Sequence, residues 1–123
     1  MKRSEFLIAV IDKNYTLVSK AIESGENVNQ CDSSGWTALH FAAQNVDVKM
    51  GQLLINNRAS VDLQDKFGNS PLWRATFSSR GEGAFITLLL VNGAKRDLKN
   101  FSEVPPLDLA KNIDNYDVLQ FYK

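Results

Sequence analysis

Residues 32–43 read DSSGWTALHFAA, and a closely related sequence recurs twice further along the chain. A second copy starts 33 residues later, at Asp65, and reads DKFGNSPLWRAT. A third, more divergent copy starts 35 residues after that, at Asn100, and reads NFSEVPPLDLAK. A period of this length is typical of solenoid proteins, in which each repeat buries its apolar face only by stacking on its neighbours.

Each repeat carries signals for two short helices. In the repeat that starts at Asp32, the segments LHFAA and VKMGQLLI place apolar residues at helical spacing. Thr37 and Ser70 stand where a helix needs an N-cap, and Pro71 takes the first helical position. The sequence therefore predicts helices that begin directly after Thr37 and Ser70.

The ends of the second helices are marked by glycine. Gly25 and Gly93 follow two of these helices, at a position where a left-handed backbone is favoured. Arg58 takes the corresponding place in the repeat between them, so we expect that helix end to cost stability.

The repeat that starts at Asp65 is two residues longer than the one before it. We assign the extra residues to Ser79 and Arg80, in a loop between two helices, with Gly81 and Gly83 turning the chain back. Insertions in repeat proteins fall in loops, frequently on the binding side. Arg80 is therefore a candidate partner contact, and a neutral lengthening of the loop is the alternative.

These patterns resemble the ankyrin-repeat family over essentially the whole chain. The most specific match is G-x-T-A-L-H-x-A-A at residues 35–43. A second, G-x-S-P-L-x-x-A at residues 68–75, is followed by L-L-x-x-G-A at residues 89–94. The resemblance implies a single all-α domain, an ankyrin-repeat solenoid of about four helix-turn-helix units with short β-turn fingers, capped at both ends. The predicted units are residues 4–31, 32–64, 65–99 and 100–123.

The two end units are expected to present polar outer sides, as a solenoid requires for solubility. At the start these are Lys2, Arg3, Glu5, Ser19, Lys20 and Glu23, and at the end Lys111, Asp114, Asp117 and Gln120. Phe121 and Tyr122 are expected to pack back on the third unit, and a dimer contact through them is the alternative. The free protein is expected to be a monomer.

Composition excludes several classes of partner. The chain has 123 residues, of which 14 are basic and 14 acidic, so no net charge attracts it to nucleic acid or to an anionic membrane. No apolar run approaches the roughly 18 residues of a membrane span. A single cysteine, Cys31, excludes an internal disulfide, and no cleavage site follows the short apolar start. These features predict a soluble, reduced, cytoplasmic domain.

The sequence shows none of the groupings that catalysis commonly uses. In the ankyrin pattern, the one histidine, His40, belongs to the hydrogen-bond network of the turn with Thr37. Cys31 is expected to be a partly buried, inert thiol. Neither a phosphate-binding glycine loop nor a calcium-loop spacing occurs. We predict a protein that is not an enzyme and that uses no cofactor and no metal.

The resemblance implies that another protein binds on the concave face formed by the fingers and the first helices. Carried over one unit at a time, the predicted partner-binding residues are Trp36, Phe41, Gln44, Asn45, Lys66, Phe67, Asn69, Arg74, Phe77, Ser78, Arg80 and Phe101. Trp36, Phe67 and Phe101 are either exposed for a partner or lie sideways on the next finger. Trp73 is interpreted as a packing residue, and Arg74 as a contact or as a solvated charge beside a carboxylate.

The predicted function is a protein-binding module that acts by occupying its partner. Residues 65–99 carry six basic and three acidic groups, which favours an acidic patch on that partner. The sequence also resembles small stand-alone bacterial ankyrin proteins, some of which are thought to be immunity proteins that neutralise a toxin. The alternative is a scaffold or self-associating assembly protein without inhibitory action.

Overall fold

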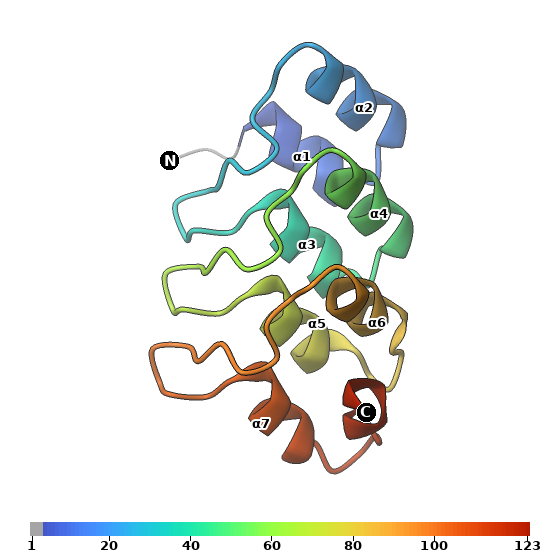
Figure 1. Ribbon diagram of the computed structural model, residues 1–123. Coiled ribbons are helices and arrows are strands. Elements are labelled where there is room, and N and C mark those ends of the chain that lie inside the picture. The colour runs from blue at the N-terminus through green and yellow to red at the C-terminus, as the bar shows by residue number, and fades with distance from the viewer. Residues whose placement is uncertain (1–3) are drawn as a thin grey trace.

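The computed structural model describes residues 4–123, and in this range the chain folds into short helices joined by loops (Figure 1). The helices are α1 (Glu5–Ile11), α2 (Tyr15–Glu23), α3 (Ala38–Gln44), α4 (Val48–Asn56), α5 (Pro71–Ser78), α6 (Ala84–Val91), α7 (Pro106–Lys111) and the 3-10 helix η1 (Leu119–Tyr122). The predicted all-α solenoid is confirmed. Lys2 and Arg3 of the expected N-terminal cap lie outside the described residues.

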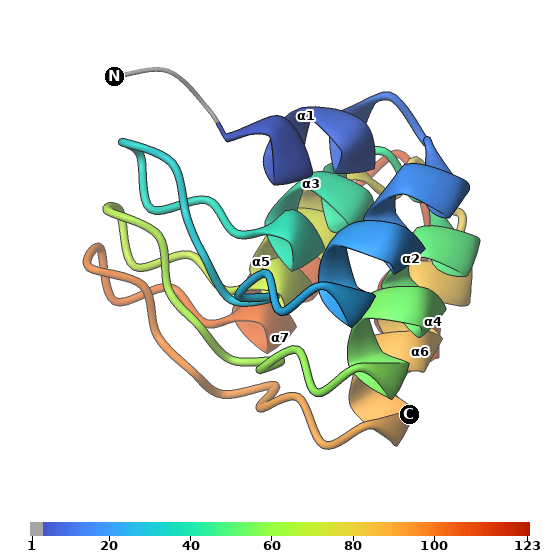
Figure 2. The same ribbon diagram turned by 90° about the horizontal axis from the view of Figure 1, so that it is seen from above.

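The helices stack in two rows. Helices α1, α3, α5 and α7 pack on one another in sequence and form the inner row. In the outer row, α4 packs on α6 and α6 on η1, while α2 continues that row beside α1. The long loops, residues 24–37, 57–70 and 92–105, project from the inner row as three finger loops (Figure 2). Within residues 4–123, no helix is both long enough and apolar enough to cross a bilayer.

One continuous core runs along the stack between the two rows. Its members are apolar side chains from consecutive helices, with Leu7, Leu39 and Leu72 from the inner row and Met50, Leu54 and Leu89 from the outer row almost completely buried. Because each helix pair buries its apolar face on the next pair, the repeat in the sequence becomes a repeat in packing.

The predicted helix starts are confirmed. The side chains of Thr37 and Ser70 accept hydrogen bonds from the backbone N–H groups of His40 and Trp73, and Pro71 is the first residue of α5. Such a cap satisfies one of the backbone donors that the first turn of a helix leaves without a partner.

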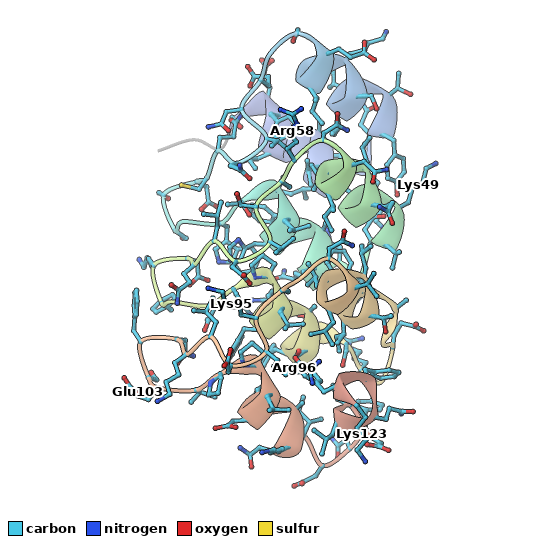
Figure 3. All side chains as sticks on the ribbon, viewed as in Figure 1. Lys49, Arg58, Lys95, Arg96, Glu103 and Lys123 are labelled. Atoms are coloured by element: carbon cyan, nitrogen blue, oxygen red, sulfur yellow. The ribbon has the colours of Figure 1, made fainter. Side chains whose placement is uncertain are left out.

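The tips of the three finger loops are closed by one recurring arrangement. Oδ1 of Asp32, of Asp65 and of Asn100 each accepts two backbone N–H bonds, from the residues two and four positions further on. The chain then turns through a left-handed residue, which is Gly35, Gly68 or, in the last finger, Glu103. Glu103 is labelled on its finger loop in Figure 3. Asx side chains are well suited to such turns because they bond to backbone close by in sequence.

Positive φ angles confirm the predicted ends of the outer helices. Gly25 and Gly93 have φ values of 100° and 87°, and Arg58 adopts 72°. Arg58, labelled in Figure 3, follows α4. A side chain in this region places Cβ close to backbone oxygen, which costs about 1–2 kcal/mol. Arg58 therefore carries strain that its glycine counterparts avoid.

We expect Arg58→Gly to raise the free energy of unfolding by about 1 kcal/mol, less than the full strain because glycine also loosens the unfolded chain. Chemical denaturation of the two proteins measures this difference. Arg58→Ala is the matched control, since it removes the same charge but keeps Cβ and should give no gain. An equal gain in both variants would point to the charge and not to the backbone.

The prediction that the longer repeat lengthens the connection between its two helices is confirmed, since α5 and α6 are joined by residues 79–83. The inner and outer helices of the first two pairs are joined by residues 12–14 and 45–47, each with a positive φ at the middle residue, Lys13 or Val46. Ser79 and Arg80 both lie in this longer connection, and their assignment as the two extra residues stays a prediction.

The C-terminal segment closes the stack against the third helix pair, as predicted. Tyr122 is 2% exposed and shares a hydrogen bond between its hydroxyl and that of Thr76. The Phe121 ring occupies the space beside Gly83 that a Cβ would need. Arg96 donates from Nη1 to the Tyr122 carbonyl oxygen at 2.6 Å, beside the C-terminal turn in Figure 3. Burial of Tyr122 removes it from the alternative dimer contact.

Candidate protein-binding surface

A hollow of about 670 Å³ opens on the concave side of the stack, between the ends of α3 and α5. Six of the predicted partner-binding residues line it, and these are Gln44, Asn45, Arg74, Phe77, Ser78 and Arg80. Two residues that the sequence did not indicate, Val46 and Ser79, complete the lining. We call this the central hollow. The structure thus brings together half of the residues that were assigned to the surface one repeat at a time.

Three aromatic rings surround the guanidinium of Arg74 at one side of the central hollow. Its Cζ lies 4.7 Å from the ring centroid of Trp36, 5.3 Å from that of Trp73 and 5.6 Å from that of Phe77. The rings of Trp73 and Phe77 are themselves stacked, with 11° between their planes. Each such contact attracts a cation, so the rings hold the guanidinium in a defined place. Trp73 is half-buried in this stack, in the packing role that the sequence predicts.

Arg74 is not neutralised by a close carboxylate. Among residues 4–123, the ion pair within contact distance is Lys99 with Glu103, and the Nε atom of Arg74 is buried without a hydrogen-bond partner. Burial lowers the pKa of Arg74 and the charge of Asp65 raises it, yet a guanidinium stays protonated in proteins. The central hollow therefore contains a fixed positive charge.

Two smaller hollows continue the central one in both directions. One, of about 280 Å³, is lined by Asp32, Ser34, Trp36, Phe41 and Gln44, so it shares Gln44 with the central hollow. The other, which we call the third hollow, has a volume of about 390 Å³ and shares Phe77, Ser79 and Arg80 with the central hollow. It reaches α7 and the residues after it, and its lining includes Leu109, Ile113 and Tyr116. The three together form a groove along the inner row, and Phe77 is the ridge between two of them.

Two predicted contact residues are buried and leave the proposed set. Phe41 is 8% exposed because the Trp36 ring lies over it, with 4.9 Å between the centroids. Asn69 is 6% exposed, and its Oδ1 accepts a hydrogen bond from the side chain of Asn100 in the next finger. Both were assigned to the concave side by their position in the repeat, but Phe41 is covered by Trp36 of its own repeat and Asn69 by its contact with the next repeat.

The finger aromatics behave in two ways. Trp36 is half-buried under Arg74, whereas Phe67 and Phe101 are 60% and 71% exposed. The ammonium of Lys66 lies 5.5 Å from the centroid of the Phe67 ring. Lys66, Phe67 and Phe101 therefore lie on the finger loops, outside the groove, and form a second exposed part of the predicted surface.

A comparison with protein families matches residues 6–120 to ankyrin repeats, in three copies. The chain belongs to the ankyrin-repeat family. A putative ankyrin repeat protein from Rickettsia bellii is 33% identical over 112 residues, which are 89% of this chain and 34% of that protein. A neurogenic locus notch homolog protein 1 from Xenopus laevis is 30% identical over 103 residues, or 83% of this chain and 4% of that protein. The chain thus spans a small part of these relatives.

Membership of the ankyrin-repeat family has a functional consequence. Ankyrin repeats are in general non-enzymatic modules for protein–protein interaction, and extended concave surfaces are what solenoids offer to partners. In the described part of the chain, no three His, Cys, Asp or Glu side chains come together closely enough to hold a metal ion.

The single histidine of this ankyrin protein is fully buried in the turn network. Its Nδ1 accepts from the backbone N–H of Thr37 at 3.2 Å, and its Nε2 donates to the carbonyl of Asn69 in the next finger at 2.8 Å. Burial lowers the pKa of His40, and the hydrogen bond to Asn69 opposes this shift. Cys31 pairs with Thr37 in an isolated β-bridge and is exposed, so the expectation of a partly buried thiol is wrong.

The lining residues that were not predicted from the sequence lie in the connections between helices. Val46 and Ser79 follow α3 and α5, in the connections to the outer helices, and both line the central hollow. Tyr116 comes from the segment between α7 and η1 and lines the third hollow. The position of Val46, one residue before the N-cap Asp47 of α4, could have indicated a corner between two helices. Its residue type gave no such indication, because β-branched residues rarely adopt a left-handed backbone.

Proposed function

We propose that this chain binds a protein partner along the groove of its concave side, with the central hollow as the main contact. The observation that carries the proposal is Arg74, a cation held between three rings at the edge of an open hollow and without a close carboxylate. Arginine and aromatic side chains are the residues that most often dominate binding energy in interfaces. We also propose that the protein is located in the cytoplasm and that its repeats comprise residues 4–31, 32–64, 65–99 and 100–123.

Site-specific photo-crosslinking in cells that express the protein tests which face binds. A photoreactive amino acid at Ser78, in the central hollow, is expected to capture one protein, which mass spectrometry identifies. The matched position is Thr87, which is exposed on the outer helix α6. Capture of the same protein from Thr87 but not from Ser78 would place the interface on the opposite side and end the proposal.

Phe77→Ala is expected to weaken binding of the captured partner by at least about tenfold, because Phe77 is 59% exposed at the ridge of the groove. Val91→Ala is the matched control, since Val91 is a 79% exposed apolar residue of α6 in the outer row and should change nothing. Isothermal titration calorimetry with the purified partner measures both. Circular dichroism checks that both variants remain folded.

The fate of the partner separates the two forms of the proposal. A partner that loses its activity when saturated with this chain identifies an inhibitor, and a toxin among the captured proteins identifies the immunity role expected from the sequence. A partner that keeps its activity and enters a larger complex identifies a scaffold.

A further inference from the structure

The sign of the charge changes along the groove. The lining of the central hollow contains the two cations Arg74 and Arg80 and no carboxylate. Its other polar members, Gln44, Asn45, Ser78 and Ser79, are neutral and can donate hydrogen bonds. The third hollow, by contrast, includes the carboxylate of Asp114. The centre of the groove is therefore positive and its end beside α7 is negative.

The side chain of Arg74 is preorganised to bind a hydrogen-bond acceptor. The rings of Trp36, Trp73 and Phe77 restrict its guanidinium, so little rotamer entropy remains to be lost when it forms a bond. A guanidinium carries its donors in one plane, in a fork that matches the two oxygens of a carboxylate. A ring on the face of that plane does not block its edge, and the buried nitrogen of that edge is Nε. Arg80, an exposed residue of the loop after α5, lines the same hollow.

We propose that the central hollow binds the carboxylate of a glutamate or aspartate side chain of the protein partner, with Arg74 as the fixed forked donor and Arg80 as the second cation. This inference rests on the proposed function and names the chemistry of its main contact. It assigns Arg74 to recognition of charge, whereas a packing role alone would require only its contacts with the rings.

The surroundings favour a carboxylate on a polypeptide over a free anion or a polyanion. On either side of the central hollow, apolar side chains line the groove, Trp36 on one side and Leu109, Ile113 and Tyr116 on the other. These suit the apolar neighbours of an acidic residue in a bound segment. Asp114 opposes a chain of negative charges such as nucleic acid.

The test uses two small probes of the same shape, N-acetyl-L-glutamic acid α-methylamide and its neutral glutamine counterpart. Each is titrated at millimolar concentration into the isotope-labelled protein, and the arginine Nε–H signals are followed by NMR. We expect the glutamate probe to shift the Arg74 signal saturably and the glutamine probe to leave it unchanged. The exposed Arg58, which does not line the groove, serves as an internal control.

Two variants separate charge from geometry, with the backbone amide signals of Asn45 and Ser78 as the readout. Arg74→Lys keeps the charge but loses the fork and the stacking plane, so the dissociation constant of the glutamate probe should rise at least about tenfold. Arg80→Gln should raise it only about fivefold, since Arg80 is exposed. Equal responses to the two probes, equal shifts of Arg74 and Arg58, or unchanged affinity in Arg74→Lys would each overturn the inference.

Failure of this inference is distinguishable from failure of the proposed function. Suppose that the partner still crosslinks from Ser78 with undiminished affinity in an Arg74→Gln, Arg80→Gln variant. The concave surface then stands, and the carboxylate is not its anchor. Suppose instead that the glutamate probe binds at Arg74 but no protein crosslinks from Ser78. The hollow then recognises carboxylates, and the protein-binding function falls.

Discussion

Gly68→Ala is expected to lower the free energy of unfolding by about 3 kcal/mol, a sum of backbone strain and steric overlap. Gly68 has a φ of 81°, which a side chain adopts only with strain. A Cβ built there would also lie 2.6 Å from the backbone nitrogen of Phe101 and 3.0 Å from Cα of Asn100, so two finger loops would have to separate. Chemical denaturation with native and variant proteins measures the loss.

Gly93→Ala is the matched control for this experiment. Gly93 has a φ of 87°, but a Cβ there meets nothing within 4 Å. It should therefore cost only the strain of the left-handed backbone, about 1 kcal/mol. The difference between the two variants measures how closely the second and third finger loops are stacked. Equal losses would show that the fingers tolerate separation and that their stacking adds little to stability.

His40→Ala is expected to cost about 3 kcal/mol, because it removes a buried side chain together with both of its hydrogen bonds. His40 is 0% exposed and links the N-cap Thr37 to the carbonyl of Asn69 in the next finger. Thermal denaturation measures the change. Gln44→Ala, an exposed change in the same helix α3, should stay within about 0.5 kcal/mol. A small effect of His40→Ala would mean that the link between fingers is not a main source of stability.

The same histidine makes stability depend on pH. Burial lowers the pKa of His40 below its ordinary value of 6.5, so as pH falls the unfolded chain takes up the proton before the folded one. Its contribution to stability is therefore complete above about pH 6.5 and is lost as pH falls from there towards the folded pKa, with a slope of at most about 1.4 kcal/mol per pH unit. Because His40 is the single histidine, His40→Ala should abolish this slope. A native protein of constant stability in this range would contradict the assignment.

Local chemistry explains why much of the fold follows from the sequence. The caps Thr37 and Ser70 act on backbone three residues away, and the left-handed positions at Gly25, Gly93 and Arg58 depend on the helix that they end. Such features repeat with the period of the chain, so one repeat helps to interpret the next. The fourth pair departs from this pattern because its outer member is the short η1, whose aromatic residues pack on the third pair.

The sequence predicted the concave surface only in so far as a residue's position in the repeat determines the side of the stack on which its side chain lies. Position in the repeat placed Gln44, Arg74 and Phe77 on the same side, and they do line one hollow. It also placed Asn69 there, although a hydrogen bond to Asn100 and the link from His40 bury that residue between fingers. Contacts of this kind join residues about 30 positions apart, and no local signal specifies them.

The sequence by itself determined the ankyrin fold, the helix starts and ends, and the absence of net charge, because these depend on period, local backbone chemistry and composition. Only the tertiary structure decided that Trp36, Trp73 and Phe77 surround Arg74 and that the central hollow holds two cations without a carboxylate. The physical reason is that these side chains come from two neighbouring repeats. Their distances depend on how closely the inner helices stack, and stacking is a property of the packed core.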